Sequence, residues 1–123
     1  MILIADDNTD FRRTIRTMVE EFDAEVLECS DGGEAVEQYE IHRSEWVLMD
    51  INMRPLDGLS AMRTILERHP EARVVIVSQY QDVRTREAAL AMGAYAFIGK
   101  ENLMELRELI REEVGSHLTA TER

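Results

Sequence analysis

Chemically capable side chains follow four short apolar runs in this chain. Asp6 and Asp7 follow the first run, Asp50 the second, Ser78 the third, and Lys100 comes shortly after the fourth. Three carboxylates in one cleft repel each other unless a cation or protons neutralise them. An all-oxygen donor set that leaves room for water and phosphate favours Mg²⁺ over zinc or copper. The residue types therefore predict a magnesium site.

An aspartate beside such a cation can also act as a nucleophile and take up a phosphoryl group as an acyl phosphate. The metal ion and a lysine then spread the charge of the phosphoryl oxygens, and positioning does most of the remaining work. Asp50, Mg²⁺ and Lys100 would fill these roles.

The apolar runs have the character of strands buried on both faces of a parallel sheet, because they are continuous rather than alternating. They cover residues 2–5, 46–49, 74–77 and 95–98. A weaker strand is expected over residues 25–29, and its charged ends predict an edge position. Cys29, its last residue, is expected to be small and buried rather than redox-active.

Segments with helical spacing separate these strands. Apolar residues recur every three or four positions over 11–22 and 59–66, and again from Leu103 to Val114, where Gly115 is expected to end the helix. A further helix is expected after Asp31. Strands and helices alternate, which predicts a single α/β domain with a parallel sheet covered on both faces. The carboxyl ends of its strands then form the ligand site. The polar segment 116–123 is expected to fray, or to begin a linker to a further domain.

Composition narrows the functional classes. The 123 residues carry 14 Lys and Arg against 25 Asp and Glu, a net charge of -11, which disfavours non-specific binding to nucleic acid or to anionic membranes. The single cysteine cannot form an internal disulfide, which favours a reducing compartment. The first residues lack the pattern of a signal peptide, and no run approaches the roughly 20 apolar residues of a membrane span. A cytoplasmic protein is expected.

Five short motifs in order then resemble the receiver domain of two-component response regulators. They are Ile4-Ala5-Asp6-Asp7-Asn8, Leu48-Met49-Asp50-Ile51-Asn52-Met53 with Leu56-Asp57-Gly58, Val77-Ser78, Gly93-Ala94, and Phe97-Ile98-Gly99-Lys100. The resemblance covers essentially the whole chain. It implies a doubly wound, flavodoxin-like fold of five strands in the order 2-1-3-4-5 with five helices, in a receiver domain over residues 1–115.

The resemblance also implies roles for the site residues. Asp50 would accept phosphate from a phosphohistidine of a sensor histidine kinase or a phosphotransfer protein. Asp7 would be the main acidic Mg²⁺ ligand, Asp6 would act through water, and the backbone carbonyl of Asn52 would complete the set. The protein would be a phosphoacceptor regulator rather than a conventional enzyme, controlling an output such as transcription.

The implied switch links phosphorylation to a surface change. Ser78 and Lys100 would bond to the new phosphoryl oxygens, and Phe97 would rotate from solvent to the interior. The surface made by the fourth helix, the fifth strand and the fifth helix would then change, and a homodimer could form through it. Its candidate contact residues are Arg84, Arg86, Tyr95, Met104 and Arg107.

The sequence departs from the family pattern at three places. Arg54 stands where the family usually has proline, and Pro55 follows it, which shifts the backbone restraint by one residue. Gln79 replaces a usually small residue, so access to Asp50 is expected to be narrower. Tyr80 borders the path of the attacking water, so slow loss of phosphate is expected.

Two alternatives remain open at this point. A degenerate receiver would bind partners without being phosphorylated, and Arg54 and Gln79 motivate that hypothesis. A phosphatase of the haloacid dehalogenase type also uses an aspartate after a buried strand. That class needs a second aspartate two residues later as general acid, and this chain has Asn52 there.

Overall fold

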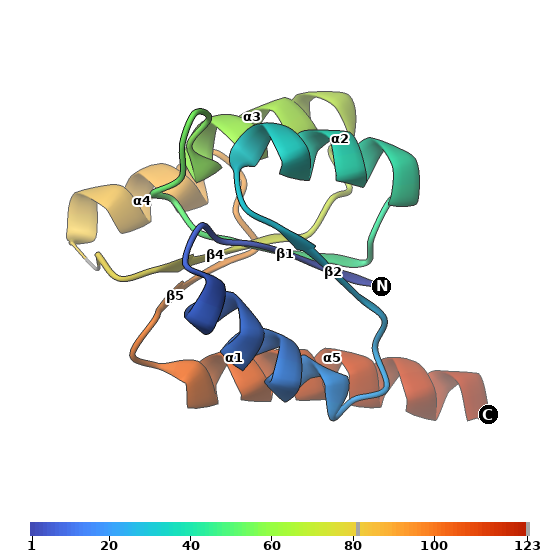
Figure 1. Cartoon of the computed structure of the whole chain (residues 1–123). Coiled ribbons are helices and arrows are strands. Elements are labelled where there is room, and N and C mark those ends of the chain that lie inside the picture. Colours follow the sequence, from blue (N-terminus) through green and yellow to red (C-terminus); the bar gives the residue numbers. More distant parts are fainter. Residues whose placement is uncertain (81, 123) are drawn as a thin grey trace.

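The computed structural model describes the backbone of residues 1–80 and 82–122, and the side chains of residues 1–80 and 82–113. Five strands and five helices alternate along the chain (Figure 1). The strands are β1 (Ile2–Ala5), β2 (Val26–Cys29), β3 (Trp46–Met49), β4 (Val74–Ser78) and β5 (Ala96–Gly99). The helices are α1 (Thr9–Glu20), α2 (Gly32–His42), α3 (Gly58–Arg68), α4 (Val83–Ala91) and α5 (Leu103–Glu122).

All neighbouring strands pair in parallel, in the order β2-β1-β3-β4-β5. The predicted fold, strand order and edge position of β2 are confirmed. Ala5 of β1 pairs with Cys29 of β2 on one side and Met49 of β3 on the other, while Ser78 of β4 pairs with Gly99 of β5. The residues that follow these strand ends are therefore brought to one edge of the sheet.

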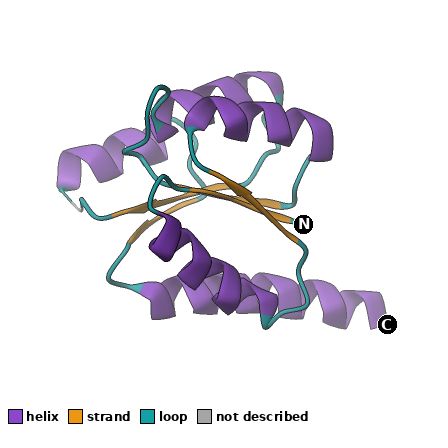
Figure 2. Cartoon of the chain, viewed as in Figure 1, coloured by secondary structure: helices purple, strands orange, loops and turns teal. Residues whose placement is uncertain are grey.

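Helices cover both faces of the sheet, as the continuous apolar strands require. Helices α2, α3 and α4 lie on one face, and α1 and α5 lie on the other (Figures 1 and 2). A hydrophobic core lies on each face of the sheet, and alternate residues of β3 point into the two cores. Val47 and Met49 belong to the core under α2, α3 and α4, and Trp46 and Leu48 belong to the core under α1 and α5. Burial raises the pKa of Cys29 to about 12, which fits the expected inert core residue.

Four helices begin at a short polar side chain that accepts a hydrogen bond from a free backbone N–H of the first turn. Asn8 caps α1, Asp31 caps α2, Asp57 caps α3 and Asp82 caps α4. Such caps satisfy donors that have no partner within the helix. The caps set the residue at which each helix begins, next to the carboxyl edge of the sheet. They therefore also set the length of the loops that carry the candidate residues.

Several sequence-based boundaries differ from those of the structure. The helix expected to stop at Gly115 continues to Glu122, because a helical glycine costs only about 1 kcal/mol relative to alanine and does not by itself end a helix. The backbone of the segment expected to fray is helical to that point, and Arg123 and the side chains from Val114 onward lie outside the described residues. Strand β5 begins at Ala96, one residue later than expected, and β2 begins at Val26.

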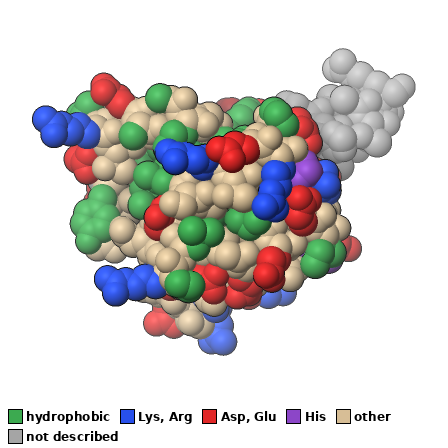
Figure 3. Space-filling model, turned by 90° about the horizontal axis from the view of Figure 1, so that it is seen from above, with side chains coloured by type: hydrophobic (Ala, Val, Ile, Leu, Met, Phe, Trp, Pro, Cys, Tyr) green, Lys and Arg blue, Asp and Glu red, His purple; other side chains and the backbone are tan. Residues whose placement is uncertain are grey.

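The outer surface shows no concentration of one charge sign over α2, α3 and α4. Figure 3 shows that acidic, basic and hydrophobic side chains are interspersed on this face. Among the described residues, no helix has the length and apolar character needed to cross a bilayer.

Candidate functional site

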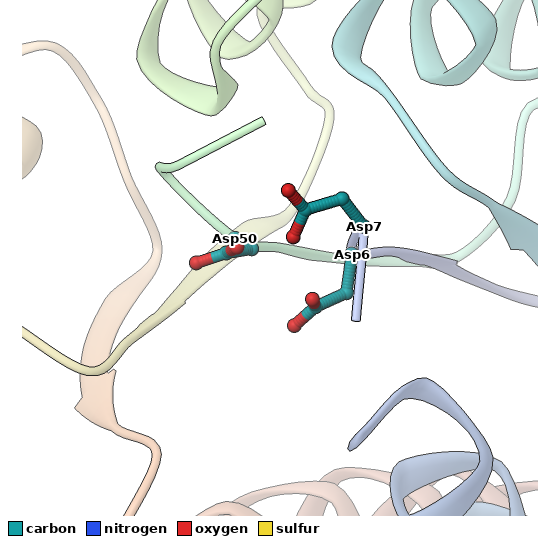
Figure 4. A group of neighbouring side chains, drawn as sticks. All are labelled: Asp6, Asp7 and Asp50. Atoms are coloured by element: carbon teal, nitrogen blue, oxygen red, sulfur yellow. The ribbon is translucent and has the colours of Figure 1, made fainter. Parts of the chain in front are cut away.

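Three carboxylates converge at the carboxyl edge of the sheet. Asp6 and Asp7 follow β1, Asp50 follows β3, and one oxygen atom of each lies within 4.8 Å of one oxygen of the others (Figure 4). The backbone N–H of Asp50 donates to the carbonyl of Ala5 at 2.9 Å, which continues the pairing of the two strands. Asp6 and Asp50 are buried, and Asp7 is exposed. The sequence predicted this cluster correctly.

Lys100 pairs with the most buried of the three carboxylates. Its Nζ lies 2.8 Å from Oδ2 of Asp6 and 3.6 Å from Oδ2 of Asp50. The other oxygen of Asp6, Oδ1, accepts a hydrogen bond from the backbone N–H of Asn8 at 2.8 Å. Lys100 also lies over the ring of Phe11, 4.5 Å from its centroid, where a cation is attracted to the aromatic face. Both oxygens of Asp6 are therefore engaged within the protein.

The surroundings of Asp50 favour the protonated form of its carboxyl group more than water does. Burial, and after it the negative charge of Asp6, raise its pKa to about 6, although Lys100 and a hydrogen bond from the backbone of Asn52 act in the opposite direction. Perturbation of this kind marks candidate functional groups. A metal ion or a phosphoryl donor with its own cation would relieve the repulsion between these carboxylates.

The backbone of the loop after β3 presses closely around Asp50. Gly58, the first residue of α3, donates its N–H to the carbonyl of Ile51 at 2.8 Å. A Cβ atom at position 58 would overlap the carbonyl of Asp50, so only glycine allows this approach. The peptide bond between Arg54 and Pro55 in the same loop is cis.

Ser78 lies at the end of β4, where the sequence placed it. Its side chain is fully buried, and its Oγ accepts a hydrogen bond from the backbone N–H of Tyr80 at 3.0 Å. Its carbonyl accepts the backbone N–H of Lys100 at 2.8 Å, which ties the two strand ends together. Gln79 and Tyr80 are exposed beside it, and their effect on access to Asp50 stays a prediction.

The aromatic position of the proposed switch is inside the protein. Phe97 is 4% exposed and packs in the core beneath α2, α3 and α4. Its backbone carbonyl accepts a hydrogen bond from Nη1 of Arg86 at 3.3 Å. The ring therefore occupies the inward position expected of the active state, and its rotation stays a prediction.

The candidate partner residues do not all have the same surroundings. Met104 and Arg84 are exposed, and Tyr95 is half exposed, with its hydroxyl donating to Glu113 at 2.9 Å. Arg107 differs from the others, because it pairs with Glu21 at 3.2 Å and lies over the ring of Phe22 beside the end of α1. Its contacts with Glu21 and Phe22 set it apart from the other candidates, and its role in partner binding stays a prediction.

Sequence reasoning missed three residues that shape the site. Gly58 was part of a recognised motif but had no assigned role, and its close approach to Asp50 depends on the loop path. Phe11 was interpreted only as a core residue of α1. Arg12 donates to the backbone carbonyl of Asp6 at 2.6 Å, and nothing in its spacing indicates this contact.

The donor chemistry fits a divalent cation of the magnesium type. The cluster offers carboxylate oxygens alone, with an exposed Asp7 and a nearby lysine in place of a full protein cage. Mg²⁺ commonly uses one or two carboxylates and keeps several waters. Nitrogen and sulfur ligands, which zinc prefers, are absent from the grouped residues.

Comparison with known proteins agrees with this geometry. The family model described as response regulator receiver domain matches residues 2–111. The chemotaxis protein CheY of Listeria monocytogenes is 35% identical over 100 residues, which is 80% of this chain and 84% of that protein. The transcriptional regulatory protein DegU of Brevibacillus brevis is 34% identical over 103 residues, covering 81% of this chain and 43% of DegU.

Solved structures show the same likeness. The crystal structure of the CheX-CheY-BeF3-Mg+2 complex from Borrelia burgdorferi matches with a TM-score of 0.80 and 25% identity, covering 88% of this chain and 85% of that chain. Four of the curated relatives are considerably longer, and the matched part spans between 26% and 54% of their length.

Proposed function

The chain belongs to the response regulator receiver domain family, and from this premise we propose that it is a signalling switch phosphorylated on Asp50. One observation carries the proposal. Asp50 is a buried carboxylate with a raised pKa, inside a group of three carboxylates and 3.6 Å from Lys100. A raised pKa in a cluster of carboxylates is typical of a reactive group, and it is not what a purely structural carboxylate needs.

In the proposed reaction, a carboxylate oxygen of Asp50 forms a bond to phosphorus while the bond to the donor breaks. The donor is the phosphohistidine of a sensor kinase or phosphotransfer protein, and the electron pair leaves with its imidazole nitrogen. Lys100 and the hydroxyl of Ser78 would bond to the transferred oxygens, and Ser78 would give up its present bond to Tyr80.

Four groups would hold Mg²⁺ in this site: Asp7 directly, Asp6 through water, Asp50, and the backbone carbonyl of Asn52. When bound, the ion neutralises the charge on the phosphoryl oxygens. The two oxygens of Asp6 are already engaged by Lys100 and Asn8, which supports an indirect role for Asp6. The exposed Asp7 supports its direct role.

The output surface is proposed at α4, β5 and α5. Arg84, Arg86, Tyr95 and Met104 are the candidate contacts there, and homodimers would use the same surface. A new bond between Ser78 and the phosphoryl group would pull on the segment before α4, and this would move the surface. The match covers 43% of the transcriptional regulatory protein DegU, and control of transcription is one output that this surface would serve.

The family match favours a regulator over a phosphatase of the haloacid dehalogenase type, whose second aspartate is replaced by Asn52. A degenerate receiver would share the fold and family, so only its chemistry distinguishes it. Neither Gln79 nor Tyr80 makes a contact with Asp50 among those described.

The test is intact-mass spectrometry after incubation with acetyl phosphate and Mg²⁺. We expect a gain of one phosphoryl group in the native chain and none in Asp50→Asn. Asp57→Asn is the matched control, because it removes an exposed carboxylate from the same loop while asparagine still caps α3. Failure of the native chain to gain mass, with Mg²⁺ shown to bind, would support the degenerate receiver.

A further inference from the structure

Arg12, in the first turn of α1, connects the loop of the acid pair to the edge strand β2. Its Nη1 donates to the backbone carbonyl of Asp6 at 2.6 Å, and its Nε donates to Oε1 of Glu28 at 2.8 Å. Only 15% of the side chain is exposed. A planar guanidinium can hold two acceptors in a fixed relative geometry, which a lysine ammonium does not do as rigidly.

The carbonyl of Asp6 needs such a donor because the chain leaves the sheet here. The N–H of Asp6 still donates to the carbonyl of Cys29 at 3.0 Å, as in the strand ladder. Two residues later Asn8 caps α1, so the loop turns sharply within this stretch. A buried carbonyl left without a hydrogen-bond partner destabilises the fold. Arg12 supplies the missing bond and fixes the turn.

This bond completes the restraint of Asp6. Its N–H, its carbonyl and both carboxylate oxygens each have a partner: Cys29, Arg12, Asn8 and Lys100 respectively. Asp7 follows directly and is exposed. The direction in which Asp7 presents its carboxylate therefore depends on the peptide plane whose oxygen Arg12 holds.

Arg16, one helical turn later, provides a natural comparison. Its Nη1 donates to Oε2 of the same Glu28 at 2.6 Å, and its Nε lies 3.5 Å from Glu20. The contacts described for Arg16 are confined to these two glutamates. Arg12 and Arg16 thus share the anchor on β2, and they differ in the bond to the loop.

We propose that Arg12 is a positioning residue for the phosphorylation site, and that its bond to the Asp6 carbonyl sets how the acid pair presents its carboxylates to Mg²⁺. This inference rests on the proposed function of the same site. Partners that orient metal ligands typically change metal affinity by about 10–100-fold when removed. Because Arg12 holds the backbone of Asp6 and none of the carboxylates that would bind the metal, we expect about a tenfold effect, at the lower end of that range.

The experiment is titration calorimetry of Mg²⁺ into the metal-free native chain, Arg12→Ala and Arg16→Ala, with urea unfolding of each. Both substitutions should lower the free energy of unfolding, since both remove a partner of Glu28. Only Arg12→Ala should weaken Mg²⁺ binding, by about tenfold. The rate of amide hydrogen exchange at Asn8 should also rise, and only in Arg12→Ala. The N–H of Asn8 donates to Oδ1 of Asp6, and without Arg12 the Asp6 residue is held less firmly.

Arg12→Lys covers the case in which Arg12→Ala does not fold. It keeps the charge but offers one ammonium in place of the fork, so Mg²⁺ binding should still be weaker than in the native chain. Equal Mg²⁺ affinities in the Arg12 and Arg16 variants would overturn the positioning role while leaving phosphorylation of Asp50 intact. A native chain that neither binds Mg²⁺ nor gains a phosphoryl group would instead overturn the proposed function and this inference with it.

Discussion

The two ends of the parallel sheet are built from opposite kinds of side chain. At the carboxyl end, Asp6, Asp50 and Ser78 are buried polar groups arranged around Lys100. At the amino end, Trp46 is 2% exposed and lies edge-on to Tyr95, with ring centroids 4.9 Å apart. The guanidinium of Arg73 covers the Trp46 ring at 5.3 Å, beside an open cavity of about 690 Å³.

This contrast separates stability from chemistry. Burying charged groups is costly even when they are paired, so the carboxyl end holds its aspartates at the expense of the fold. Burial of large aromatic rings is among the strongest contributions to a core, so the amino end stabilises the fold. Substitutions at the two ends should therefore act on different quantities, and the predictions below test that division.

The largest effect on stability is expected at the amino end. Trp46→Ala removes a buried ring from the core between the sheet, α1 and α5, which typically costs about 3–5 kcal/mol. Urea unfolding measures this loss. The phosphorylation rate of the folded fraction should stay close to the native rate, because Trp46 lies at the opposite end of β3 from Asp50. A rate that falls along with stability would break the division between the two ends.

The next effect is a gain of stability at the carboxyl end. The pKa of Asp50 in the folded chain is about 6, above its ordinary value of 3.8, so the folded state binds this proton more tightly than the unfolded state. The protonated Asp50 contributes to the free energy of unfolding fully below about pH 4, and this contribution is lost as the pH rises through about 6. The loss amounts to about 3 kcal/mol.

Asp50→Asn removes this pH dependence. In EDTA, the variant should be more stable than the native chain above pH 6, by up to about 3 kcal/mol, and the difference should shrink toward pH 4. Urea unfolding of both proteins across this range measures the contribution of Asp50 together with its coupling to Asp6 and Lys100. A variant less stable than the native chain at pH 7.5 would show that Asp50 supports the fold.

Lys100→Ala should reduce the phosphorylation rate by about 100-fold, because one preorganised cation no longer faces the transferred oxygens. Lys100 is the only lysine of the chain, so no second ammonium can replace it. Initial rates with acetyl phosphate at saturating Mg²⁺ measure the effect. Lys100→Arg is the control for charge alone, and its full activity would show that the compact ammonium is not required.

The smallest effect concerns loss of the phosphoryl group. Tyr80 is 56% exposed beside Ser78, and its ring is expected to restrict the attacking water. Tyr80→Ala should speed dephosphorylation by about threefold, which corresponds to about 0.7 kcal/mol of activation free energy. Tyr80→Phe keeps the ring and should behave like the native chain. If the alanine variant loses phosphate no faster, the ring has no role in water access.

The sequence predicted the fold and the reactive cluster because both depend on local patterns. Continuous apolar runs indicated buried parallel strands. The polar residues directly after these strands then have to lie together at one edge of the sheet. Asp6, Asp7, Asp50, Ser78 and Lys100 all follow from that rule.

The remaining features depend on tertiary geometry. The contact of Arg12 with the Asp6 carbonyl depends on where α1 leaves the sheet, and the demand for glycine at position 58 depends on the path of the loop around Asp50. Arg107 shares its helix with Met104, yet the neighbouring end of α1 supplies its partner. Gly115 failed as a stop signal because the cost of one helical glycine is small.

The central claim is that the phosphoryl group resides on Asp50, and borohydride reduction followed by peptide mapping tests it most directly. Hydride reduces an aspartyl phosphate to homoserine and releases the phosphate, so the reacted position keeps a permanent mark. After incubation with acetyl phosphate and Mg²⁺, we expect homoserine at position 50 and unchanged aspartate at positions 6 and 7. Homoserine at position 6 or 7, with aspartate retained at position 50, would contradict the account.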